Sequence, residues 1–350
     1  MDFLLFEIMR YSVVSRFRGT LLGALVGESL AFSSAKEFQN RCDIDRIAIL
    51  GTESLIALGR LDLDDWRARQ QQASANLAIT DSISLKVILA TLPVALFFHE
   101  NTFKLRQNLL RVLKIWEDDP VVRDGTLAVG YAIAQTLTEK LHPRTLIPET
   151  IAFIGETPTS LPQQLLKVNT LLDRGAGLER VQVELSKEDK LSSAIAMAFY
   201  CFLSTLEDYR LAVLRSTQYG DVWRQDYWHL HLHSISAITG ALSGAYNSNA
   251  GIPVGWQILY SQANSAAWEL KNFSQMVELA DALVAVWSGL YNHAQHSGQL
   301  RTVGDFIPDE EASLFLGDAI RQDNRDNSEN QSNAHPPLCV YAAPRVIRSR

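Results

Sequence analysis

The chain has 350 residues, of which 47% are hydrophobic and 20% charged, as is typical of a globular protein with one large domain or two smaller ones. Its net charge of −7 excludes a global basic field that would hold nucleic acid or an anionic membrane surface. The three cysteines are far apart and form no CxxC pair, which favours a reducing compartment.

The beginning of the chain, residues 1–15, is predicted to be an extension and not a signal peptide. Its apolar stretch contains Asp2 and Glu7 and follows no basic leader. The longest apolar run, 87–98, has 12 residues and contains a proline, so it is too short to cross a bilayer. We therefore expect a cytoplasmic protein that binds neither a membrane nor nucleic acid.

Helical periodicity dominates the rest of the chain. In the stretch 191–206, for example, Leu191, Ile195, Phe199 and Phe202 recur at steps of three or four and form one apolar stripe. The predicted helices, in chain order, span 16–33, 44–60, a segment opened by Asp62 and Asp65, 79–98, 101–116, 123–140, 161–173, 191–206, 208–217, 233–248 and 261–292. Ser186, with Asp189 three residues later, is a capping signature for the helix at 191.

Alternation typical of strands is nearly absent, apart from RVQVEL (180–185) and a stretch with three histidines, WHLHLH (228–233). Many helices joined by short loops predict an all-α fold with a shared core. The last segment, 319–350, is mostly polar and is expected to be disordered. Its final residues, 338–350, are apolar and then basic, so they could also dock on a partner.

Several stretches that follow one another between residues 16 and 292 share a resemblance. They include RFRGTLLGALVGESLAF (16–32), TESLIALGRLDLDDW (52–66), ISAITGALSGAYNSNAGIPVGW (235–256) and VELADALVAVW (277–287). In this order they resemble the ADP-ribosylglycohydrolase family, which includes dinitrogenase reductase-activating glycohydrolase. The resemblance implies a compact helical bundle over residues 16–318. Small residues let helix axes approach closely, which is the structural interpretation of Gly19, Gly23, Gly27, Gly240 and Gly244.

The resemblance also implies a reaction. Family enzymes cleave the N- or O-glycosidic bond that joins ADP-ribose to a side chain, with a centre of two Mg²⁺ or Mn²⁺ ions. The metal ligands come from a T-D-D-T stretch at the second helix and a G-D-T-D-T stretch before a late Gly/Ala-rich helix. Hard dications require several carboxylate and hydroxyl oxygens at short range, and a metal pair positions water and ribose hydroxyls.

The present chain departs from both motifs. The two aspartates of D-T-D-T fall on His231 and His233, and the following threonine falls on Ser234. The T-D-D-T stretch falls in RCDIDRI (41–47), where Asp43 and Asp45 are separated by an isoleucine. At position 28 the family's aspartate is replaced by Glu28. In a second alignment Gly220-Asp221 is the true G-D of the motif, and Asp221 then points to the reaction site.

The histidines His229, His231 and His233 are metal-ligand candidates with two geometries. In an extended stretch all three share one face, whereas in a helix His229 and His233 share a face and His231 points elsewhere. Imidazole suits transition metals better than magnesium, so a rebuilt site would carry a changed chemistry. The alternative, which we favour because the spacing lacks a complete ligand set, is that the histidines bind no metal.

Three functional hypotheses follow. The leading one is a non-catalytic or strongly weakened relative without a cofactor, which binds an ADP-ribose-like small molecule or a protein partner. The second is an active hydrolase of ADP-ribosyl bonds. It would use Asp43, Asp45 and Asp221 with Mg²⁺ or Mn²⁺, or the three histidines with a transition metal. The third is a helical scaffold whose tail, 338–350, recruits a partner.

Overall fold

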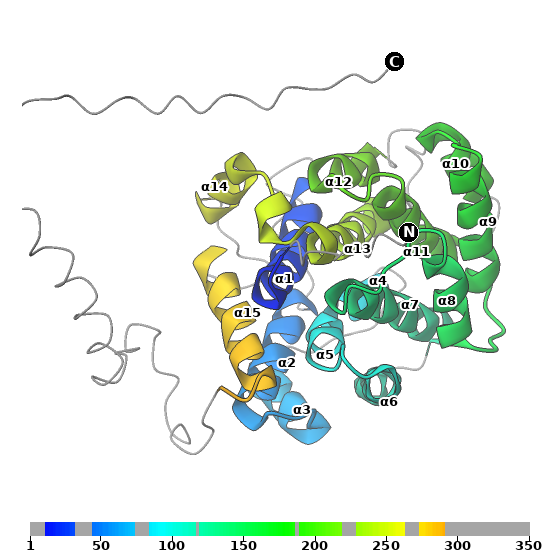
Figure 1. Cartoon of the computed structure of the whole chain (residues 1–350). Coiled ribbons are helices and arrows are strands. Elements are labelled where there is room, and N and C mark those ends of the chain that lie inside the picture. Colours follow the sequence, from blue (N-terminus) through cyan, green and yellow to red (C-terminus); the bar gives the residue numbers. More distant parts are fainter. Residues whose placement is uncertain are drawn as a thin grey trace, which may run out of the picture. The chain divides into compact units, whose positions relative to one another are not determined.

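The computed structural model describes residues 11–31, 44–73, 84–116, 119–185, 189–218, 229–262 and 273–290. These residues form helices joined by short loops and contain no strand, so the predicted all-α class is confirmed (Figure 1). In chain order the elements are α1 (Val13–Leu30), α2 (Ile44–Leu58), α3 (Leu63–Gln72), α4 (Ser84–Ala90), α5 (Leu92–Phe97), α6 (Thr102–Val112), η2 (Leu113–Ile115), α7 (Pro120–Leu137), α8 (Leu146–Ile154), α9 (Leu161–Asp173), α10 (Leu178–Leu185), α11 (Lys190–Leu203), α12 (Tyr209–Thr217), α13 (His229–Asn247), η4 (Asn249–Gly251), α14 (Val254–Gln262) and α15 (Phe273–Trp287).

The expectation of a strand over 180–185 is wrong, because these residues lie in α10. Val181 and Leu185, four residues apart, are buried, whereas Val183 between them is exposed. The burial thus has the period of a helix, and the alternation of valines in the sequence is incidental.

One of the long predicted helices is divided, and another is described only in part. The segment 79–98 contains α4, which ends at Ala90, and α5, which begins at Leu92. Pro93 lies in the first turn of α5, where its missing N–H removes no helical hydrogen bond. The segment 261–292 overlaps the end of α14 and all of α15. Helix α8 has no counterpart among the predicted helices.

Of the predicted helix caps, the one at Asp62 is confirmed and the one before residue 191 is changed. Asp62 caps α3, because its Oδ1 accepts hydrogen bonds from the backbone N–H groups of Asp64 and Asp65, both at 3.2 Å. Helix α11 is capped by Asp189, which accepts from the N–H of Ser192 at 2.9 Å. Ser186, the other member of that signature, lies outside the described residues.

The centre of the fold is the antiparallel pair of α1 and α13, which lie side by side in Figure 1. A β-carbon added to Gly19, Gly23 or Gly27 would collide with the backbone carbonyl of Gly244, Gly240 or Ser236, respectively. The two helices therefore touch through their backbones along three successive turns, and only glycine permits this approach. The packing role expected for these glycines is confirmed.

Other helices are fixed around this pair. Arg16 donates a 2.7 Å hydrogen bond to the carbonyl of Thr136 and pairs with Glu139 at the end of α7. Arg18 forms a bidentate ion pair with Asp281 of α15, at 2.6 and 2.7 Å. Helix α13 also packs against α7, α11 and α12. The two arginines fix the first half of α1 to α7 and α15, and α13 is fixed to α7, α11 and α12.

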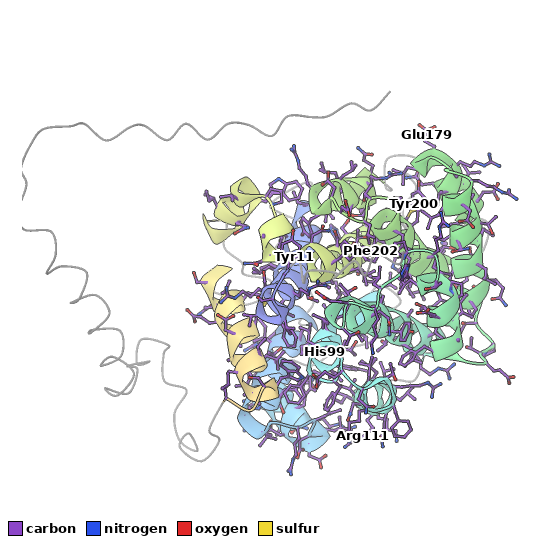
Figure 2. All side chains as sticks on the ribbon, viewed as in Figure 1. Tyr11, His99, Arg111, Glu179, Tyr200 and Phe202 are labelled. Carbon is purple, nitrogen blue, oxygen red and sulfur yellow. The ribbon has the colours of Figure 1, made fainter. Side chains whose placement is uncertain are left out.

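Apolar and aromatic side chains fill the space between the helices (Figure 2). Phe202 of α11 is fully buried and meets Tyr246 of α13 edge to face, at 6.3 Å between ring centroids. Within the described part of the chain, no helix has both the length and the apolar character needed to span a membrane. All described residues belong to one compact unit, 1–297, and the expected domain boundary at 318 lies outside them.

Candidate functional site

The histidine-bearing start of α13 lies at the end of the α1–α13 pair where α1 finishes. The antiparallel contacts place Gly27 of α1 opposite Ser236 of α13. His233 precedes Ser236 by three residues, about 4.5 Å along the helix axis. Glu28 directly follows Gly27. The fold therefore brings Glu28 and the first turns of α13 to the same end of the bundle, as the family resemblance implies.

Glu28 is the buried carboxylate of this site, with 1% of the residue exposed. Its Oε1 atom lies 3.8 Å from the Nζ atom of Lys86. The Lys86 side chain is itself largely buried, at 13% exposure, and comes from α4, which packs against both α2 and α13. An ion pair between two buried groups is screened much less than one at the surface, so each charge strongly favours the presence of the other.

Lys86 is not among the predicted site residues, although the sequence contains a signal for it. Lys86 is the only charged residue in the apolar run ISLKVILATLPVALFF (83–98). A lysine is rarely buried without a partner, so a single lysine in a run that is otherwise suited to a core helix predicts a buried carboxylate opposite it. The structure identifies that carboxylate as Glu28.

The histidine stretch is helical from His229 onward, so the extended arrangement, with all three imidazoles on one face, is wrong. At 100° per residue, His231 and His233 point to different sides of α13. His231 is buried, with 2% exposure, and His233 is partly buried. The stretch is helical because it continues directly into the Gly/Ala-rich segment that packs on α1.

The acidic candidates are only partly within the described residues. Asp45 is the second residue of α2, and Asp43 and Asp221 lie outside the described ranges. Their convergence with Glu28 therefore stays a prediction, as does metal binding by the three histidines. Among the residues that the structure describes, no group of three or more His, Cys, Asp or Glu side chains is arranged to hold a metal ion.

Comparison with known proteins places the chain in a family. The sequence model of the ADP-ribosylglycohydrolase family matches residues 35–293, about three quarters of the chain. The chain belongs to the ADP-ribosylglycohydrolase family. A solved structure described as an "ADP-ribosylglycohydrolase-related protein complex" is similar in fold, with a TM-score of 0.53 and 17% sequence identity over 79% of this chain and 99% of that one. No curated protein matches the chain in sequence.

The described residues do not fit the dimetal centre of ADP-ribosylglycohydrolases. Among the described candidate positions, Glu28 offers a carboxylate and Ser234 a buried hydroxyl, whereas His231 and His233 offer nitrogen. The Lys86 ammonium, at 3.8 Å, already neutralises Glu28. It would repel a cation on the same carboxylate by roughly 4 kcal/mol per unit charge, at about 4 Å and an effective dielectric constant of about 20.

Proposed function

We propose that this ADP-ribosylglycohydrolase-family protein has lost the metal-dependent cleavage reaction, or retains only a weak form of it, and binds a nucleotide-like ligand at the former reaction site. The observation that carries the proposal is the Glu28–Lys86 ion pair at the end of the α1–α13 pair. The ammonium group of Lys86 lies beside the Glu28 carboxylate, where a metal ion would otherwise bind. In the second metal-binding motif, His231 and His233 stand where the family has aspartates.

The preserved framework supports a binding role. The glycine contacts that set the distance between α1 and α13 are all present, so the shape of this end of the bundle is retained. Lys86, His231 and His233 replace a negative ligand set with groups that donate hydrogen bonds, and such groups suit the phosphates of an ADP-ribose-like molecule. The same end could instead recognise a protein partner, and the experiment below separates these cases.

The experiment has a catalytic arm and a binding arm. In the first, the full chain is incubated with peptides ADP-ribosylated on arginine or serine, with Mg²⁺, Mn²⁺ or EDTA. We expect ADP-ribose release no faster than the uncatalysed rate, even at high protein concentration. Release that depends on Mg²⁺ and stops with EDTA would overturn the proposal and favour the active hydrolase that uses Asp43, Asp45 and Asp221.

In the binding arm, ADP-ribose is titrated into the protein by calorimetry, with and without EDTA. We expect binding that is insensitive to EDTA and at least ten-fold weaker in Lys86→Met. Arg174→Gln, at an exposed residue just after α9, is the matched control and should bind ADP-ribose like the wild type. An absence of heat and of a thermal shift would contradict ligand binding and favour a protein partner.

Elemental analysis of untagged protein tests the histidines: stoichiometric zinc, nickel or iron would show a rebuilt metal site.

A further inference from the structure

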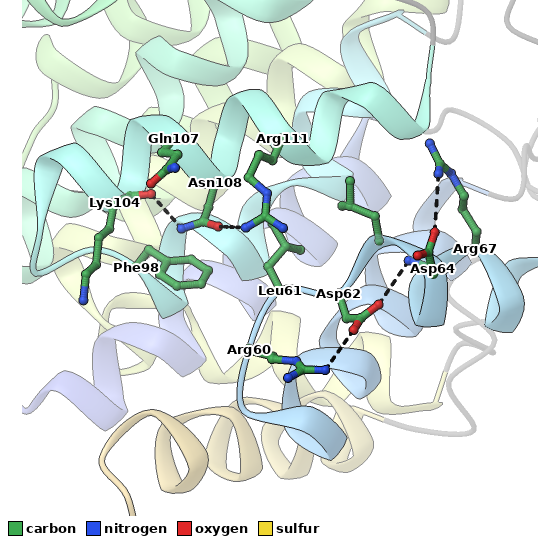
Figure 3. Close-up of a pocket in the computed structure, with 11 residues that line it drawn as sticks. Arg60, Leu61, Asp62, Asp64, Arg67, Phe98, Lys104, Gln107, Asn108 and Arg111 are labelled. Carbon is green, nitrogen blue, oxygen red and sulfur yellow. Dashed lines mark hydrogen bonds and ion pairs between the residues drawn. The ribbon is translucent and has the colours of Figure 1, made fainter.

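A second feature of the molecule lies away from the Glu28 end. A cavity of about 670 Å³ is bounded by the turn between α2 and α3, the start of α3, Phe98 after α5, and one face of α6 (Figure 3). Its lining includes Arg60, which follows α2. Helix α2 has 15 residues, about 22 Å, and the cavity lies just beyond its C-terminal end.

The volume suits a small molecule. Ligand cavities in proteins commonly measure about 300–1,000 Å³, and they combine an apolar wall with a few polar groups that fix the ligand. Here the apolar part consists of Leu61, Leu63 and the half-buried ring of Phe98. The polar part comes from α6 and from the first turn of α3.

The carboxylates that line the cavity are already engaged. Asp62 accepts from two backbone N–H groups as the cap of α3 and lies 3.2 Å from Arg60. Asp64 lies 3.8 Å from Arg67, whose guanidinium also donates to the carbonyl of Lys114 at 2.8 Å. Arg60 and Arg67 thus balance the charges of Asp62 and Asp64. Any further cationic side chain in the lining gives the cavity a net positive charge.

That net positive charge is supplied by Lys104 and Arg111 of α6, neither of which has an acidic partner among the described residues. They are seven residues apart, which places them on one face of the helix with two turns between them. Asn108 lies between them: its Nδ2 donates to the carbonyl of Lys104 at 2.8 Å, and its Oδ1 accepts from Arg111 at 3.3 Å. In Figure 3 the ring of Phe98 lies between the two cationic side chains.

We propose that this cavity is a binding site for a phosphate-bearing small molecule with a planar ring, of the nucleotide class, whose phosphates contact Lys104 and Arg111 and whose ring packs on Phe98. A guanidinium and an ammonium are the usual partners of phosphate oxygens. An aromatic ring held against Phe98 adds stacking, which lowers the free energy of binding without dependence on one particular base. In a chain with a net charge of −7, this local positive excess sets the cavity apart.

The test measures the affinity of ADP for the full chain, with inorganic pyrophosphate and adenosine as the probes that lack the ring and the phosphates. We expect ADP to bind more tightly than either probe, and the Lys104→Gln/Arg111→Gln variant to bind ADP at least ten-fold more weakly. Phe98→Ala should weaken ADP binding and leave pyrophosphate binding unchanged. Lys114→Gln, which removes an exposed cation from the same segment outside the cavity, should bind ADP like the wild type.

Two results would overturn the proposal: no ADP binding at millimolar concentration, or equal affinity in the wild type and the double variant. Because Lys104 and Arg111 are exposed, the double variant should melt at the wild-type temperature, so a loss of binding is not a loss of fold. Lys86→Met separates this cavity from the former reaction site. ADP affinity that falls with Lys86→Met and not with the double variant would assign the nucleotide to the Glu28 end and contradict a site on α6.

Discussion

The middle and the end of the α1–α13 pair follow different physical rules. In the middle, Gly23 and Gly240 bring the two backbones into contact, and no side chain fits between them. At the end, Glu28 meets Lys86 from a third helix, and side-chain charge decides what the position can do. Size therefore restricts the middle of the pair, whereas the balance of buried charge restricts its end.

This contrast separates membership of the ADP-ribosylglycohydrolase family from its reaction. The contacts that set the α1–α13 packing are between small residues and depend on size alone. The groups that hold two hard cations must be oxygens in a particular number and arrangement. A chain can therefore keep the first set and lose the second, because nothing in the packing of α1 on α13 requires carboxylates at 231 or 233.

The largest effect is expected in the middle of the pair. Gly23→Ala adds one methyl group that would collide with the backbone carbonyl of Gly240, which cannot move without separating the two helices. We expect a loss of about 3 kcal/mol in the free energy of unfolding, at the upper end for overpacking. Urea unfolding followed by circular dichroism measures this loss.

Gly255→Ala is the control for that substitution. Gly255 lies in α14, and no atom lies within 4 Å of the position its β-carbon would take. Alanine is the better helix former, so this variant should be as stable as the wild type or more stable, by up to about 1 kcal/mol. Equal stability of Gly23→Ala and Gly255→Ala would show that α1 and α13 do not touch through their backbones.

An intermediate effect is expected at the end of the pair. Lys86→Met removes the ammonium that lies 3.8 Å from the buried carboxylate of Glu28, so we expect a destabilisation of about 2–3 kcal/mol. Lys86→Met/Glu28→Gln removes both charges and should recover most of the loss, since a buried ion pair often contributes little compared with neutral groups of similar size. A double variant that is the sum of the single variants would show that the two charges are not coupled.

Much of the fold could be predicted because it depends on local patterns. In the predicted stripe of α11, Ile195, Phe199 and Phe202 are buried and Leu191 is partly buried. Asp62 caps α3, as its sequence position indicates. The glycine spacing of α1 was sufficient to predict a close helix contact. In a short segment the sequence pattern does not distinguish the period of a helix from that of a strand. The strand expected over 180–185 is for this reason wrong, and these residues lie in α10.

The site was harder to predict, since it depends on which helices meet. The alignment located Glu28 and the histidines, but no sequence rule states that α4 brings Lys86 to within 3.8 Å of Glu28. That distance follows from how α4 packs on α13 and α2, which are far from it in sequence. The cavity on α6 has the same origin, because its lining residues Arg60 and Arg111 come from segments that are far apart in the sequence.

The smallest effect is expected at the opposite end of α1, near Phe17. The buried titratable group there is the imidazole of His99 and not an ion pair. His99 lies among the rings of Phe17 and Trp287, at 5.6 and 4.9 Å, with its Nδ1 2.7 Å from the carbonyl of Leu96 (Figure 2). Burial lowers the pKa of His99 below its ordinary 6.5, against the opposing effects of the Leu96 carbonyl and Glu100. The unfolded chain therefore binds this proton more readily than the folded one.

The sign of the pH dependence follows directly. Above about pH 6.5 His99 is neutral in both states and has no effect on the pH dependence of unfolding. As the pH falls below that value the unfolded state takes up the proton first, so stability declines until the pH is below the lowered pKa of the folded state. In urea unfolding between pH 5 and 8, His99→Gln should lose part of this decline, and His142→Gln, at an exposed histidine, should retain it. If stability depends on pH in the same way in the wild type and in His99→Gln, the pKa of His99 does not differ between the folded and unfolded states. That result would contradict the described burial effect at this end of α1.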